Sequence, residues 1–133
     1  GVGERTHLLS LDDGHDVPAL LRSADVAVCP SPHDADTTTV LRAMACGAAV
    51  VAPEIGGPRD AVIADVTGLL VPPGNTAALS NALRSILRQN VLRQGMGLAG
   101  RARARSRYSW DRIATDAEVV YHAAARRAQV MSV

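Results

Sequence analysis

The side chains with the most evident chemistry lie between His33 and Arg42. A polar loop supplies His33 and two carboxylates, Asp34 and Asp36, and a predicted helix then opens with Thr37, Thr38 and Thr39. Backbone amides at a helix start favour an anion such as phosphate, although threonine hydroxyls acting as caps, with no ligand, explain these residues equally well. A guanidinium has five donors and no acceptor, so Arg42 can hold a phosphate, pair with either aspartate or simply face solvent.

Two residues of this loop leave alternatives open. Because an unperturbed histidine titrates near neutrality, His33 could act as a general acid or base, or it is an exposed loop residue with no such role. Asp36 is placed to cap the helix, in which case its carboxylate competes with a phosphate for the same amides.

Apolar runs on both sides of this helix predict the elements that position it. Val26–Cys29 indicates a buried strand ending at Pro30, Gly47 ends the helix, and Ala48–Ala52 indicates a second strand. Such a unit has parallel strands, and in parallel sheets ligands bind beyond the carboxyl ends of the strands. The loop over residues 30–36 is therefore the predicted binding edge.

A tight loop over residues 54–58 contains Gly56 and Gly57. Paired glycines permit a positive φ or the close approach of a ligand to the backbone. They are equally compatible with a plain turn.

The rest of the chain alternates between strand and helix signals. In chain order we expect a strand over His7–Leu11 and then a helix over Val17–Arg22, which Asp16 caps and which buries Leu20 and Leu21. We also expect one or two helical turns over Arg59–Ala64, a strand over Leu69–Val71, and a helix after Asn75 with Leu79, Leu83, Ile86 and Leu87 on one face. The chain should end with a helix over Asn90–Tyr108 carrying Leu92, Met96 and Leu98, a helix from Ser109 in which Trp110 and Tyr121 pack, and a frayed tail over Arg126–Val133.

Composition limits the function classes. All 14 basic residues among the 133 are arginine, so catalysis by lysine is excluded, and the net charge of +1 argues against a general binder of polyanions such as nucleic acid. The two cysteines and the lack of a signal-peptide pattern or a long apolar run favour a cytoplasmic location. The arginines at 101, 103, 105 and 107 indicate a solvated face, with contact to anionic lipid or a partner domain as an unsupported alternative.

A series of motifs follows in order along the chain, and no one of them is specific by itself. They are Pro30-Ser31, Ala43-Met44-Ala45-Cys46-Gly47, Ala49-Val50-Val51-Ala52, Gly56-Gly57, Thr67-Gly68-Leu69-Leu70-Val71-Pro72-Pro73 and Ser109-Trp110. From about Leu8 to Tyr121 the chain thereby resembles the second half of a GT-B glycosyltransferase of the retaining family 4 group. The resemblance implies an α/β fold with a Rossmann-like parallel sheet and flanking helices.

Departures from the family pattern affect the site. The family has two glutamates eight positions apart, the first on the donor sugar hydroxyls and the second on the nucleotide ribose; here these positions hold Asp34 and Arg42. The resemblance thus implies that Asp34 contacts the sugar, unless it is a solvated loop acid, and that Arg42 makes an altered contact. The family's phosphate-clamping arginine and lysine lie on upstream strands that are not in this sequence.

We therefore expect residues 1–133 to be a partial nucleotide-sugar-binding domain without its N-terminal strands, with a helical segment over about 75–127. The resemblance implies a parent enzyme that transfers a hexose from a nucleotide diphosphate sugar to an acceptor hydroxyl with retention. Its partners would be that donor and an upstream acceptor-binding domain, with no cofactor or metal, and this chain alone would be inactive and hold no catalytic residue. The alternative is a degenerate or truncated relative that acts as a binding or interaction module. The exclusively arginine basic complement and the abundant alanine, valine and glycine hint at a GC-rich bacterial source.

Overall fold

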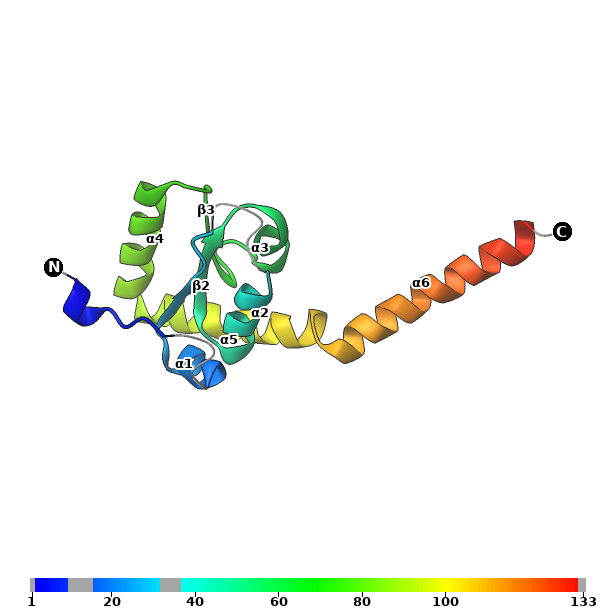
Figure 1. The fold of residues 1–133 in the computed structure, drawn as a ribbon, viewed down its shortest axis with the longest axis horizontal. Coiled ribbons are helices and arrows are strands. Elements are labelled where there is room, and N and C mark those ends of the chain that lie inside the picture. The colour runs from blue at the N-terminus through cyan, green and yellow to red at the C-terminus, as the bar shows by residue number, and fades with distance from the viewer. Residues whose placement is uncertain (1, 10–15, 32–36, 132–133) are drawn as a thin grey trace.

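The computed structural model describes residues 2–9, 16–31 and 37–131, with side chains as far as Arg127. Three parallel strands form one sheet in the order β1 (Val26–Val28), β2 (Ala49–Pro53) and β3 (Gly68–Val71). The register pairs Val26 with Ala49 and Val50 with Gly68. Helices flank this sheet (Figure 1), so the predicted α/β, Rossmann-like architecture is confirmed.

The helices connect the strands and then continue beyond the sheet. In chain order they are the 3-10 turn η1 (Gly3–Arg5), α1 (Val17–Ser23), α2 (Thr37–Cys46) between β1 and β2, α3 (Gly56–Ala61) between β2 and β3, α4 (Thr76–Arg88), α5 (Asn90–Arg107) and α6 (Trp110–Met131). The predicted caps of two of them form, because Asp16 Oδ1 accepts from the Ala19 amide at 3.0 Å and Asn75 Oδ1 accepts from the Ala78 amide at 2.9 Å.

β2 is the centre of the core, and all five of its residues are buried. Its side chains alternate between two faces, as the pleat of a strand requires. Val50 and Ala52 belong to a cluster with α2 and α3, whereas Ala49 and Val51 belong to a cluster with Ile86 of α4. The core is aliphatic, as expected for a chain without phenylalanine.

The turn after α2 ends the helix and also seats α5. Gly47 has φ +84°, and the Gly47 and Ala48 amides donate to Met44 O and Ala43 O at 2.9 and 3.1 Å, the hydrogen-bond pattern of a Schellman C-cap. A Cβ on Gly97 of α5 would collide with the Gly47 carbonyl oxygen. The backbone of α5 thus crosses directly against the amino end of β2 (Figure 1).

An arginine ties the α4–α5 corner to the start of β1. The Arg93 guanidinium donates to Leu87 O at 3.1 Å and to Asn90 Oδ1 at 3.0 Å, and it pairs with Asp25 at 2.9 Å. Its side chain is only 16% exposed, so this corner is a semi-buried polar joint.

The strand predicted over His7–Leu11 is wrong for its described part, residues 7–9, which have no regular secondary structure. Leu8 is 100% exposed. The sheet has the order β1-β2-β3, and residues 7–9 pair with none of these strands.

Helical turns begin earlier than predicted after β2. The expected turns over Arg59–Ala64 are instead α3, which starts at Gly56 and ends at Ala61. The proline at 58 lies in the first turn, where its missing N–H costs no helical hydrogen bond. The predicted tight loop is thus largely part of the helix.

Several apolar side chains are more exposed than their helical spacing suggested. Leu20 of α1 and Leu87 of α4 are exposed, although Leu21 is half-buried and packs on the core. On α5, Met96 is buried but Leu98 is 70% exposed. Helical spacing shows which residues share a face, but it does not show where the partner element ends.

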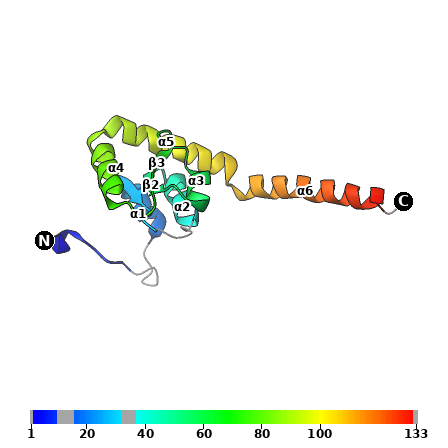
Figure 2. The same ribbon diagram turned by 90° about the horizontal axis from the view of Figure 1, so that it is seen from above.

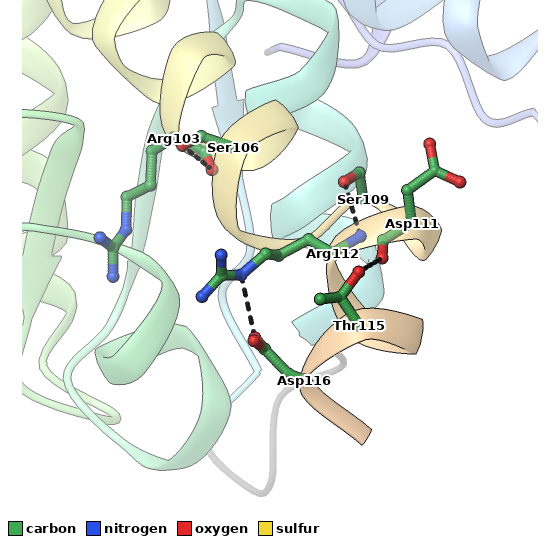
Figure 3. Close-up of polar contacts among 7 residues, drawn as sticks. All are labelled: Arg103, Ser106, Ser109, Asp111, Arg112, Thr115 and Asp116. Atoms are coloured by element: carbon green, nitrogen blue, oxygen red, sulfur yellow. Dashed lines mark hydrogen bonds and ion pairs between the residues drawn. The ribbon is translucent and has the colours of Figure 1, made fainter. Parts of the chain in front are cut away.

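The last helix, α6, extends away from the body of the molecule (Figures 1 and 2). Ser109 Oγ accepts from the Arg112 amide at 3.3 Å, as the predicted cap requires (Figure 3). The predictions that Trp110 and Tyr121 pack are wrong, because they are 84% and 73% exposed. The helix continues past Arg126 to Met131, so the tail is helical over the residues described. No helix in the described residues is both long and apolar enough to cross a bilayer.

Candidate functional site

The carboxyl ends of the three strands lie at one edge of the sheet, as their parallel pairing requires. α2 and α3 both begin at this edge. A Cβ added to Gly57, in the first turn of α3, would overlap the Thr37 hydroxyl and lie 2.9 Å from Thr37 Cβ. The structure therefore brings together two of the predicted site segments, Gly56-Gly57 and the threonines, in direct contact.

The two glycines have different roles in this arrangement. Gly56 has φ +52°, a conformation that glycine adopts without the strain imposed by a side chain. Gly57 leaves room for the side chain of Thr37. The positive φ was among the predicted reasons for the glycines. The side chain of Thr37 lies close to Gly57, and the predicted approach of a ligand stays a prediction.

The start of α2 presents three threonines at this edge. Thr37 is half-buried, and Thr38 and Thr39 are exposed. The first amides of any α-helix have no acceptor within the helix, and together with the helix dipole they form an electropositive end. Three predicted site residues, His33, Asp34 and Asp36, lie outside the described residues.

Arg42 lies further along α2 and is exposed. With Ala45 and Cys46 it lines one side of a groove of about 430 Å³, and Val17, Pro18 and Leu21 of α1 line the other. Most of these lining side chains are apolar. Arg42 forms no ion pair with the part of the chain that the structure describes, and the predicted pairing with Asp34 or Asp36 cannot be placed because both lie outside it.

A smaller hollow lies at the strand ends on the α4 side. It has a volume of about 130 Å³ and is lined by Cys29 and Pro30 after β1, Pro53 of β2, residues 72–75 after β3 and Leu79 of α4. Sites for drug-sized ligands are roughly 300–1,000 Å³. The hollow alone is thus too small for such a ligand.

Sequence reasoning missed Arg103 and Tyr108, which hold the far end of α3. Arg103 Nε donates to Ala61 O at 2.8 Å, and Tyr108 Oη donates to Asp60 O at 3.2 Å. The expectation that Arg103 lies on a purely solvated face is therefore wrong. The spacing of Gly97, Gly100 and Ala104 marks the buried face of α5, and Arg103 borders it, so this stripe of small residues was the available signal.

Metal ligands do not gather in the described residues, where no three His, Cys, Asp or Glu side chains are placed to hold a metal ion. Cys29 and Cys46 are not joined in a disulfide bond.

Comparison with known proteins places this chain in a family. The sequence profile described as glycosyl transferases group 1 matches residues 1–103. The chain is 36% identical over 121 residues to the D-inositol 3-phosphate glycosyltransferase of Salinispora tropica, which covers 91% of this chain and 25% of that protein. It is 38% identical over 114 residues to the glycogen synthase of Mycobacterium tuberculosis, which covers 86% and 28%.

Among solved structures, the chain is similar to sucrose-phosphate synthase from Thermosynechococcus elongatus, with a TM-score of 0.84 and 32% identity over 95% of this chain and 32% of that one. The chain therefore belongs to the glycosyl transferases group 1 family, and its fold matches the C-terminal domain of a GT-B glycosyltransferase. It spans about a quarter of the length of the two curated relatives named above, 25% and 28%.

Proposed function

We propose that this chain is the donor-binding half of a retaining, family 4 glycosyltransferase. The whole protein would transfer a hexose from a nucleotide diphosphate sugar to an acceptor hydroxyl. The supporting observation is that in this chain, which belongs to the glycosyl transferases group 1 family, the starts of α2 and α3 meet through Thr37 and Gly57 at the carboxyl edge of the sheet. That edge is where ligands of doubly wound folds bind.

In this proposal the domain binds the nucleotide-sugar donor. The amides over Thr37–Thr39 hold the diphosphate, and as the sugar leaves they stabilise the negative charge that develops there. Asp34 accepts hydrogen bonds from sugar hydroxyls, and Gly56 lets backbone approach the donor. Arg42 contacts the donor as a cation in place of a carboxylate, for example at a phosphate.

The remaining catalytic parts belong elsewhere in this proposal. No side chain in these 133 residues is assigned a catalytic role, and the acceptor binds a separate, upstream domain. The diphosphate is neutralised by amides and arginines, so the proposal includes no metal or cofactor.

Replacing Asp34 in the full-length protein tests this assignment. Asp34→Ala should weaken binding of the nucleotide diphosphate sugar by about tenfold or more, since a hydrogen bond to a charged group is worth about 1.5–3 kcal/mol. Calorimetric titration with UDP-, GDP- and ADP-sugars measures the effect. Asp111→Ala, which removes an exposed carboxylate on α6, is the control and should bind as the wild type does. Equal affinity of both variants would count against a donor contact by Asp34.

A degenerate relative that acts as a binding or interaction module is the second candidate. It is favoured by Arg42, which faces a mainly apolar groove where the family has a glutamate. Arg42→Glu in the full-length protein separates the two candidates. It should weaken donor binding if Arg42 makes an altered but productive contact, and it should restore or strengthen binding if the site is degenerate.

A further inference from the structure

Two side chains at the end of α5 hold the carboxyl end of α3. The Arg103 guanidinium donates twice, from Nε to Ala61 O at 2.8 Å and from Nη2 to Asp60 O at 2.9 Å. Tyr108 Oη donates to the same Asp60 oxygen at 3.2 Å. The guanidinium carbon also lies 5.8 Å from the centre of the Tyr108 ring, within the range of a cation–π contact. We call Arg103 and Tyr108 the α5 clamp.

The chemistry of the clamp suits its position. The last carbonyls of a helix lack intrahelical partners and carry partial negative charge, so a cation stabilises them. Arginine presents its donors in a rigid fork, and this fork can reach two successive carbonyls at once. Figure 3 shows the Arg103 side chain extending away from the Ser109 and Arg112 contacts at the α5–α6 junction.

α3 needs such support because it has only six residues. A helix this short is not stable by itself and takes its position from tertiary contacts. Its buried contacts include Pro58 and Ala61. The clamp adds directional hydrogen bonds at one end, and those bonds specify where α3 lies along its own axis.

The other end of α3 has no freedom to shift toward α2. At Gly57 the backbone already lies against Thr37 so closely that a single added carbon would overlap it. A movement of α3 toward α2 is therefore transmitted to Thr37, the first residue of α2. Direct contacts therefore lead without a gap from the α5 clamp through α3 and Gly57 to Thr37.

We propose that Arg103 and Tyr108 are positioning residues for the donor site: through α3 they fix the contact between Gly57 and Thr37 at the start of α2. This inference rests on the proposed function, because the contact between Gly57 and Thr37 affects donor binding only if the donor binds at the start of α2. Neither residue touches the donor, so their effect on binding is indirect.

The positioning itself can be tested without any ligand. In amide NMR spectra of the full-length protein, Arg103→Ala should shift the resonances of Gly56, Gly57 and Thr37. The control is Arg105→Ala, two residues along the same helix, where the side chain is exposed and makes no hydrogen bond or ion pair with described residues; it should leave them in place. Unchanged Gly57 and Thr37 resonances in Arg103→Ala would overturn the proposal.

The consequence for binding is tested with UDP, GDP and ADP as probes, at a temperature where every variant is folded. Arg103→Ala should weaken the affinity for the nucleotide that the wild type binds by roughly tenfold, and Arg105→Ala should not. Shifted resonances with wild-type affinity would also overturn the proposal, because α3 would then move without effect on the site. If the wild type binds none of the probes, the proposed function is what fails, and the spectra alone decide whether the clamp positions α3.

Two milder variants keep the test valid if Arg103→Ala does not fold. Tyr108→Phe removes one hydrogen bond to Asp60 O and keeps the ring, so its shifts should be smaller but at the same residues. Arg103→Lys keeps the charge but loses the fork, and at a temperature where it and the wild type are both folded it should bind the nucleotide more weakly than the wild type. Wild-type affinity together with a lowered melting temperature would indicate a stabilising role only and would contradict positioning.

Discussion

Gly57 is constrained by a residue twenty positions earlier in the chain. The sequence offered two reasons for the glycine pair, a turn or the approach of a ligand, and the structure shows that Gly57 accommodates the side chain of Thr37. Spacing along the chain could not reveal this contact because it joins the starts of two different helices. The relevant physical quantity is the gap between α2 and α3, which only the folded chain defines.

A substitution at Gly57 should therefore act through Thr37. Gly57→Ala forces the two helix starts apart, and overpacking of this kind typically costs about 1–3 kcal/mol. We expect a loss of this size in the free energy of unfolding, measured by urea denaturation. Because the clash needs the Thr37 side chain, adding Thr37→Gly should cost less in the Gly57→Ala background than in the wild type. Strictly additive losses would show that the two residues do not meet.

The packing of α5 depends on which of its glycines faces the sheet. A Cβ on Gly95 would meet no described atom within 4 Å, whereas the same atom on Gly97 would strike Gly47 O. The two residues lie two positions apart in one helix, so they have the same intrinsic preference for helix and differ only in their surroundings.

Alanine at these two positions should have opposite effects. Gly95→Ala should stabilise the protein by up to about 1 kcal/mol, because alanine is the better helix former. Gly97→Ala should destabilise it by about 1–3 kcal/mol, because α5 must move away from the Gly47 turn. Thermal or urea unfolding of both variants is the measurement. Two changes of the same sign would mean that helix propensity outweighs this contact.

The elements that sequence alone predicted well are those whose signals are local. β2 is a run of small and β-branched apolar residues, and α2 runs from the threonines to Gly47, which ends it. Asp16 and Asn75 are recognisable as caps because a cap acts on the three residues that follow it. Each of these features is decided within a few residues of the chain.

The predictions that failed needed information from distant parts of the chain. Residues 7–9 have the composition of a strand but no neighbouring strand among the described residues. Arg103 lies 42 residues from its acceptor Ala61, and Trp110 has the residue type of a core position but lies on a helix that leaves the core. For the donor site itself, the contacts of Asp34 and Arg42 stay predictions.

At the scale of the whole molecule, the chain consists of a packed body and a projecting helix (Figure 2). The side chains of α6 are exposed over nearly all of its described length, with Ala117 half-buried. Its internal contacts are local, such as the Arg112–Asp116 pair at 3.0 Å. Within the chain as the structure describes it, α6 contributes little to the core.

Removing α6 should therefore leave the body intact. A chain ending at Ser109 should keep its melting temperature within about 4 °C, which corresponds to a change of roughly 1 kcal/mol for a domain of this size. Differential scanning calorimetry of the isolated chain, with and without residues 110–133, gives the comparison. A much larger fall would show that α6 supports the body through contacts other than the local ones described above.

The close contact between Gly47 and Gly97 limits how this sequence can diverge. Gly47 is needed for its positive φ, and Gly97 is needed because the Gly47 carbonyl occupies the space of its side chain. The first demand concerns backbone conformation and the second concerns volume, so a change at one position cannot be compensated by a change at the other. Elsewhere in a core, a larger residue at one position can be compensated by a smaller residue at its partner. At Gly47 and Gly97 no such pair of neutral substitutions is available.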